Sequence, residues 1–306
     1  MSKYIITGAT SFIGKAVVEE LLRAGHQVYV VIRPESEKKH WFDGRNNCFV
    51  ILTDIKNIEI CEENMQKADY FMHFGWDGIG AQGRSNPDIQ AENVKNTVKC
   101  IETAVKLKCR GFVFAGSQAE YGIKHELIKE TLSCEPVIEY GKAKLKVLNE
   151  GMRIAQTNEL NYYHARIFSV YGVGDHPWTL VSSCVKGFLS GKEVKTSSGE
   201  QMWNFMYIDD IAKALIMLTA SNATTGIYNI ASKDTRPLKE FIQEIYQCCG
   251  EKGKLLMGTH NPVEIPNNLI PDVSKLESVI GNIPETKFSD GIKEMILQFK
   301  QEDKES

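Results

Sequence analysis

The chain has 306 residues, of which 42% are hydrophobic and 25% charged, and its formal net charge is -3. This nearly balanced charge argues against a strongly basic nucleic-acid-binding protein, and the apolar fraction is that of an ordinary globular chain. No apolar run approaches the roughly eighteen residues of a membrane span, and the N-terminal residues show no signal-peptide pattern. The eight cysteines form no CxxC pair, so we expect reduced thiols, no metal site and a cytoplasmic location.

Strand-like and helix-like patterns alternate through the first half of the chain. Strands are expected at Lys3–Ile6, Gln27–Ile32, Phe49–Leu52, Tyr70–His73, Gly111–Ala115 and Tyr162–Ile167. Amphipathic helices are expected at Phe12–Ala24, Asn93–Lys106 and Gly141–Ala155. This alternation predicts an α/β fold with a Rossmann-like, doubly wound parallel sheet.

The alternation breaks after Ile167. A helix is expected from Thr179, a mostly helical segment at Met206–Ala220 and a return strand at Ile227–Ile230, with two or three helices beyond Leu238. We therefore expect one domain from residues 1–167, with return segments near 204–231. Residues 168–203 and 232–306 would form a smaller, mainly helical C-terminal lobe.

The junction between the first strand and the first helix reads TGATSFIG over residues 7–14. A dinucleotide pyrophosphate needs backbone N–H groups at a helix N-terminus and little side-chain bulk around them. The loop resembles the GxxGxxG loop of the extended short-chain dehydrogenase/reductase superfamily, with Ser11 in place of the middle glycine. The resemblance implies an NAD(P)-binding first domain, with a coenzyme loop formed by Gly8, Thr10, Ser11, Phe12, Ile13 and Gly14.

The end of the second strand indicates which dinucleotide binds. NAD-binding proteins usually carry an acid there, which accepts from the ribose hydroxyls, whereas this chain has Ile32 followed by Arg33. An arginine can bind a 2′-phosphate, so we expect NADP, with NAD as the second choice. Asp54 matches the superfamily's adenine-binding Asp, and Phe74 and Gly75 resemble the loop that flanks the coenzyme.

Tyr140 and Lys144 form a YxxxK motif, whose spacing places both side chains on one face of a helix. The ammonium is expected to lower the pKa of the phenol toward the working pH. Ser117 follows the fifth strand, where the superfamily has its substrate-orienting Ser or Thr. The resemblance implies that Tyr140 is the general acid or base, that Lys144 tunes it and holds the nicotinamide ribose, and that Ser117 binds the reacting oxygen.

Residues 165–172 and 206–212 resemble two segments of nucleotide-sugar epimerases and dehydratases, which implies a nucleotide-sugar substrate in the smaller lobe. Ser169 and Trp203 replace two diphosphate ligands of those relatives. Arg166 and Arg236 are the alternative ligands that the sequence offers.

The set of possible reactions is narrowed because catalytic residues of two groups of relatives are absent from this chain. The acid and base of sugar 4,6-dehydratases are replaced by Gln118 and Ala119, and the Cys and His of GDP-fucose synthases are absent too. We therefore expect reduction of a nucleotide-linked 4-keto-(deoxy)sugar at C4 by NADPH. The alternatives are a 4-epimerase with bound NAD and a non-catalytic NADP-sensing protein. By resemblance, we also expect a homodimer formed through Asn93–Lys106 and Gly141–Ala155.

Overall fold

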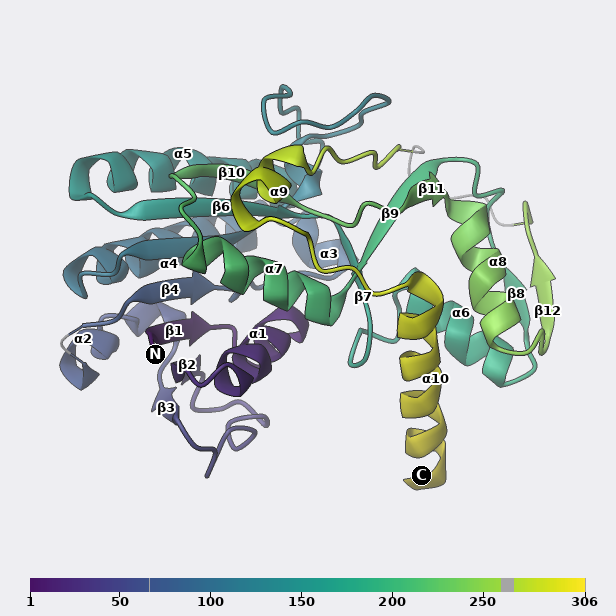
Figure 1. The fold of residues 1–306 in the computed structure, drawn as a ribbon, viewed down its shortest axis with the longest axis horizontal. Helices are drawn as coiled ribbons and strands as arrows, with labels where there is room; N and C mark the ends of the chain where they lie inside the picture. The colour runs from purple at the N-terminus through teal and green to yellow at the C-terminus, as the bar shows by residue number, and fades with distance from the viewer. Residues whose placement is uncertain (66, 260–266, 306) are drawn as a thin grey trace.

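The computed structural model describes residues 1–65, 67–259 and 267–305, which Figure 1 shows as a ribbon. A seven-stranded parallel sheet in this part of the chain has the order β10-β6-β5-β4-β1-β2-β3. Its strands are β1 Lys3–Thr7, β2 Gln27–Ile32, β3 Cys48–Leu52, β4 Tyr70–His73, β5 Gly111–Ser117, β6 Asn161–Ile167 and β10 Gly226–Ile230. The expected Rossmann-like α/β fold is thereby confirmed.

Helices cover both faces of this sheet, because side chains of each buried strand point alternately to opposite sides. Tyr4 and Ile6 of β1 belong to the apolar cluster beneath α1 and α7, whereas Ile5 belongs to the cluster beneath α4 and α5. These helices are α1 Phe12–Arg23, α4 Pro87–Lys106, α5 Glu139–Asn158 and α7 Ile208–Ala220. Shorter helices are η1 Ile55–Asn57, α2 Ile60–Asn64, α3 Ala81–Arg84, η2 Gln118–Glu120 and α9 Ser274–Ile280.

A smaller group of elements lies beside the carboxyl ends of the sheet strands (Figure 1). Its helices are α6 Leu180–Leu189, α8 Leu238–Cys248 and α10 Phe288–Glu305. Two small sheets accompany them, formed by β7 Ser169–Tyr171, β9 Met202–Tyr207 and β11 Thr235–Pro237, and by β8 Glu193–Lys195 and β12 Lys254–Leu256. Phe188, Phe241 and Phe288 fill its core. Of the segment 232–306, residues 260–266 and 306 lie outside the described residues.

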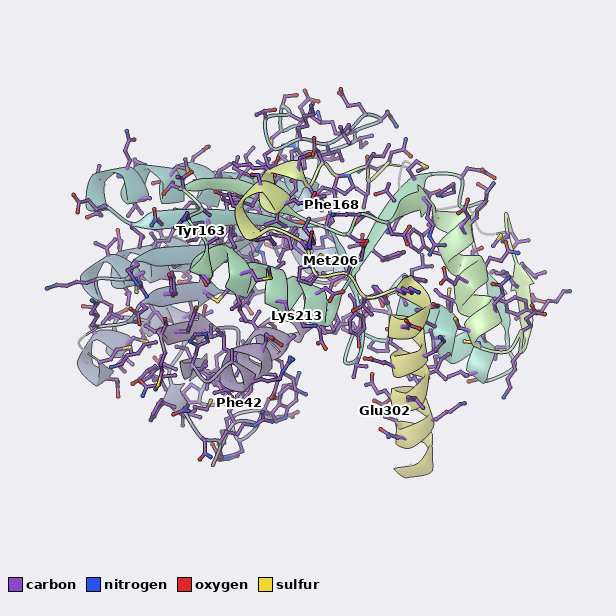
Figure 2. The ribbon with its side chains drawn as sticks, in the orientation of Figure 1. Phe42, Tyr163, Phe168, Met206, Lys213 and Glu302 are labelled. Carbon is purple, nitrogen blue, oxygen red and sulfur yellow. The ribbon has the colours of Figure 1, made fainter. Side chains whose placement is uncertain are left out.

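Several helix boundaries differ from the sequence prediction, among them the starts of α7 and α4. The helix expected from Met206 begins at Ile208, because Met206 and Tyr207 end β9 and pair with β7. Figure 2 shows Met206 at the junction between the large sheet and the smaller group of elements. α4 begins at Pro87 rather than Asn93, because the Asn86 side chain caps it by accepting from two backbone N–H groups.

α4 and α5 pack side by side on one face of the sheet. Ile89 of α4 and Met152 of α5 are partly exposed on them. The pairing of two copies through these helices stays a prediction. Within the ranges described above, the helices lack the combination of length and apolar character that a membrane span requires.

Candidate active site

The loop after β1 lies where the strand order of the sheet reverses, between β1 and β4, which is where open α/β sheets bind ligands. Gly8 has a positive φ of 68°, and the Ser11 hydroxyl caps α1 by accepting from the N–H of Gly14 at 3.1 Å. A Cβ on Gly8 would lie 2.4 Å from the nitrogen of Gly75. The loops after β1 and β4 therefore touch backbone to backbone, and only glycine fits at position 8.

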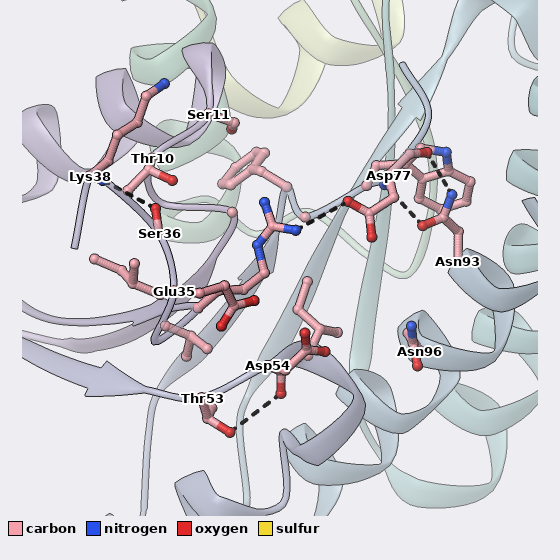
Figure 3. Close-up of a pocket in the computed structure, with 18 of the residues that line it drawn as sticks. Thr10, Ser11, Glu35, Ser36, Lys38, Thr53, Asp54, Asp77, Asn93 and Asn96 are labelled. Carbon is pink, nitrogen blue, oxygen red and sulfur yellow. Dashed lines mark hydrogen bonds and ion pairs between the residues drawn. The ribbon is translucent and has the colours of Figure 1, made fainter. Parts of the chain in front are cut away.

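A cavity of about 470 Å³ opens at this point (Figure 3). Seven of the predicted coenzyme ligands line it: Gly8, Thr10, Ser11, Arg33, Asp54, Phe74 and Gly75. Three loop residues do not. Phe12 and Ile13 pack toward the core of the smaller lobe, and Gly14 lies buried against the carbonyl of Gly8. Asp54 also caps η1 by accepting from the N–H of Lys56.

Other lining residues escaped the sequence analysis, among them Ser36, Lys38, Thr53, Asp77 and Asn93 (Figure 3). Their positions just after strands or on the following helix are the signal that could have found them. Asn96 lines the cavity as well, and its buried Oδ1 accepts from no group of the described residues. An acceptor without a donor and a glycine-lined cradle both fit a dinucleotide.

Arg33 lies in this cavity with a mostly exposed guanidinium, 3.7 Å from the carboxylate of Asp77. Asp77 is held by Asn93, which accepts from its N–H at 3.0 Å and donates to its carbonyl at 2.9 Å. The cation predicted to select NADP thus already has an acidic neighbour, although both side chains remain open to solvent.

α5 and the end of β5 bring together Ser117, Tyr140 and Lys144. Lys144 is only 3% exposed, and its ammonium donates to the carbonyl of Ala115 at 2.8 Å. It lies 3.6 Å from the centre of the Trp76 ring and 5.4 Å from that of Tyr140. Burial lowers the pKa of Lys144 to about 7.

Tyr140 and Ser117 line a second cavity of about 330 Å³. The pKa of the Tyr140 phenol is raised, because its burial outweighs the opposing influence of the Arg84 guanidinium and the Ser117 hydroxyl. The expectation that the lysine lowers this pKa toward the working pH is therefore wrong for the chain alone. The buried Lys144 points its ammonium at the Ala115 carbonyl, and desolvation dominates at the phenol.

A buried ionic network lies behind Ser117. The carboxylate of fully buried Glu120 accepts from the Ser117 N–H at 2.8 Å, from His164 Nε2 at 2.9 Å and from Arg166 Nε at 2.8 Å. Burial alone would raise the pKa of Glu120, but His164, Arg166 and the Ser117 N–H together hold it below its ordinary value. Arg166 is only 1% exposed and forms an ion pair with Glu120, so its guanidinium is held in the interior.

Three further residues from the sequence analysis have structural partners. Arg236 forms ion pairs with Asp234 and Glu244. Trp203 packs among the apolar side chains of the smaller lobe. His73 is buried between the hydroxyls of Thr7 and Thr97, at 2.6 and 3.0 Å, and burial lowers its pKa to about 3. His73 is thus a neutral structural histidine. In the described part of the chain, no His, Cys, Asp and Glu side chains gather in a group that could hold a metal ion.

A doubly wound sheet, a glycine loop at its switch point and an adjoining Ser–Tyr–Lys group together define an extended short-chain dehydrogenase/reductase. The sequence profile of the NAD dependent epimerase/dehydratase family matches residues 4–231, and the chain belongs to that family.

Similar proteins include a UDP-N-acetyl-alpha-D-glucosaminuronate decarboxylase of Bacillus cytotoxicus, 25% identical over 97% of both chains. A dTDP-6-deoxy-L-talose 4-dehydrogenase (NAD(+)) of Aggregatibacter actinomycetemcomitans is 26% identical over 78% of this chain and 88% of its own. Among solved structures, a UDP-glucuronic acid 4-epimerase from Bacillus cereus in complex with UDP-glucuronic acid and NAD has a TM-score of 0.80. It is 20% identical, over 98% of this chain and 99% of its own, and therefore supports the fold alone.

Proposed function

We propose that this chain is an NAD(P)-dependent oxidoreductase that acts at C4 of a nucleotide-linked sugar through Tyr140. The observation that carries the proposal is the convergence of Ser117, Tyr140 and Lys144 beside the cavity of the Gly8 loop. Residues 1–167 with the return segments near 204–231 would bind the coenzyme, and residues 168–203 and 232–306 would bind the sugar nucleotide. A relative named as a 4-dehydrogenase supports the choice of C4.

Each side chain of the group has a distinct role in this reaction. When bound, the coenzyme supplies or accepts the hydride at the sugar carbon. Tyr140 gives its phenolic proton to the oxygen of the carbonyl as it becomes an alcohol, and Ser117 donates a hydrogen bond to the same oxygen. Lys144, in its protonated form, would hold the nicotinamide ribose and stabilise the negative charge that forms on the phenol when Tyr140 gives up its proton. The raised pKa of Tyr140 keeps it protonated at neutral pH, which suits the reductive direction.

The direction we favour is reduction of a 4-keto sugar by NADPH. Ile32 at the end of β2 carries no carboxylate for the ribose hydroxyls, and Arg33, Ser36 and Lys38 line the cavity beyond it, interspersed with Glu35 and Glu37. The second candidate is a 4-epimerase that retains NAD. It is favoured by the ion pair that joins Arg33 to Asp77, because this pair gives the cation expected to select NADP an acidic partner.

Two measurements on the purified protein test this proposal. Mass spectrometry of small molecules released on denaturation identifies NADP(H), NAD or a retained nucleotide sugar. A panel of 4-keto nucleotide sugars is then incubated with NADPH, and UDP-sugars are incubated with NAD. NADPH oxidation that depends on the 4-keto sugar supports the reductase. Interconversion of two UDP-sugars without net coenzyme change identifies the epimerase instead, and binding of NADP(H) with neither reaction identifies a sensor and overturns the proposal.

A further inference from the structure

Arg84 ends α3, in the segment that joins β4 to α4, and its guanidinium reaches the proposed catalytic phenol. The guanidinium carbon lies 4.6 Å from the centre of the Tyr140 ring. Arg84 lines the second cavity together with Ser117, Tyr140 and His176. The proton transfer proposed above makes no use of this cation.

The guanidinium has one buried donor that the described part of the chain does not satisfy. Nε of Arg84 is shielded from solvent and donates to no group of the described residues. No Asp or Glu of the described chain is among the residues that line this cavity, whose other titratable members are Tyr140 and His176. A buried donor without an acceptor is costly, and a cation without a nearby carboxylate attracts an anion.

The segment that carries Arg84 is held rigidly in place. The side-chain amide of buried Gln90 donates to the Gly83 carbonyl at 2.9 Å, and the Trp76 indole donates to Gln90 at 2.8 Å. Gly83 packs closely on Gly78, because a Cβ added to Gly83 would lie 2.4 Å from the Cα of Gly78. The position of Arg84 is thus set by packed backbone, as expected of a preorganised binding group.

We propose that Arg84 binds an anionic substituent on the sugar ring of the substrate, such as the carboxylate of a uronic acid. The inference rests on the proposed function, because Tyr140 marks the position of the C4 oxygen and the carboxylate of a uronic acid is borne by the neighbouring carbon, C5. A guanidinium fork matches a carboxylate with two parallel hydrogen bonds. The inference argues against a 6-deoxysugar substrate, because the substituent on C5 of such a sugar is an uncharged methyl group.

Binding measurements test this assignment without depending on turnover. The Tyr140→Phe protein keeps the aromatic ring beneath Arg84 and cannot convert its ligand, so it serves as the background. Titration calorimetry with saturating coenzyme compares UDP-glucuronic acid, UDP-glucose and UDP on this protein and on its Arg84→Met derivative. The matched control is Arg153→Met, which removes an exposed guanidinium of α5 that pairs with Glu150.

We expect UDP-glucuronic acid to bind about 10- to 100-fold more tightly than UDP-glucose, the range for a hydrogen bond to a charged group. Arg84→Met should abolish this preference and leave the affinity for UDP unchanged, and Arg153→Met should preserve it. Equal affinities for the two sugars in the parent protein overturn the inference while the proposed function stands. If Arg84→Met loses as much affinity for UDP as for UDP-glucuronic acid, the arginine binds the diphosphate, and this result also overturns the inference. Failure of all three ligands to bind while coenzyme binds contradicts the proposed nucleotide-sugar function and overturns the inference that rests on it.

Discussion

The carboxylate of Glu120 accepts the backbone N–H of Ser117 at 2.8 Å, so a fully buried acid fixes the end of the strand that carries the hydroxyl proposed to orient the substrate. The Ser117 hydroxyl in turn accepts from the N–H of Ala119, which completes a capping box around η2. The same carboxylate neutralises the buried guanidinium of Arg166. One side chain thus links the stability of the fold to the geometry of the site.

Replacing Glu120 by glutamine should destabilise the protein strongly. The substitution keeps the shape but leaves Arg166 buried without its counter-charge, which costs about 3–5 kcal/mol. Urea denaturation gives the change in the free energy of unfolding. The control is Glu150→Gln on the surface of α5, where the exposed pair with Arg153 is worth at most about 1 kcal/mol. Equal effects of the two substitutions would contradict a structural role for the buried network.

Tyr140→Phe should abolish turnover and leave coenzyme affinity nearly unchanged. Loss of a general acid or base lowers kcat by about 100- to 10,000-fold, whereas the ring and its contacts with Trp76 and Arg84 remain. Steady-state kinetics and coenzyme titration measure the two effects separately. Tyr246→Phe, at a tyrosine on α8 away from the site, is the control and should behave as the parent protein. Persistent turnover would remove Tyr140 from the mechanism.

Gly8→Ala should weaken coenzyme binding by at least about 10-fold, because the new Cβ meets the backbone of Phe74 and Gly75 where the two loops touch. Gly25 offers a matched control. Its φ of 77° resembles that of Gly8, but a Cβ there meets nothing within 4 Å. Gly25→Ala therefore isolates the backbone strain, about 1 kcal/mol of stability, from the steric effect on the loop. If both variants bind coenzyme as the parent does, this loop does not hold it.

Arg33→Ala should weaken NADP+ binding by about 10- to 100-fold and leave NAD+ binding nearly unchanged, because only NADP+ presents a 2′-phosphate to the guanidinium. Dissociation constants for both coenzymes on both proteins provide the comparison. A parallel loss for NAD+ would show that Arg33 shapes the cavity, through its contact with Asp77, rather than selecting NADP.

Lys144 should make the stability of the protein depend on pH. Burial lowers its pKa to about 7 in the folded chain, whereas a lysine in the unfolded chain has its ordinary pKa of 10.5. Between these values the unfolded chain binds more protons, so the free energy of unfolding rises with pH by up to about 1.4 kcal/mol per unit. The difference between the parent and Lys144→Met, measured in urea from pH 6 to about 10, isolates this contribution. This difference in the free energy of unfolding should be constant below pH 7 and change above it. A difference that is constant over the whole range would show that the folded lysine titrates normally.

The sequence by itself determined most strands and helices, the glycine loop and the placement of Tyr140 and Lys144 on one face of a helix. Each of these depends on residues close together in the chain. Alternation of short apolar runs with helical patterns specifies strands and helices, and a spacing of four places two side chains on one helix face. The start of α4 at Pro87, capped by Asn86, follows the same local rules and could have been predicted from the sequence.

Only the tertiary structure decided what surrounds the phenol. Arg84 lies beside Tyr140 although 56 positions separate them, and Glu120 of η2 contacts His164 and Arg166 of β6. Such contacts arise because parallel strands end at one edge of the sheet, where loops from distant parts of the chain converge. Desolvation likewise depends on all neighbours at once. The direction of the Tyr140 pKa shift therefore depends on the burial of the phenol, and the spacing between Tyr140 and Lys144 does not specify that burial.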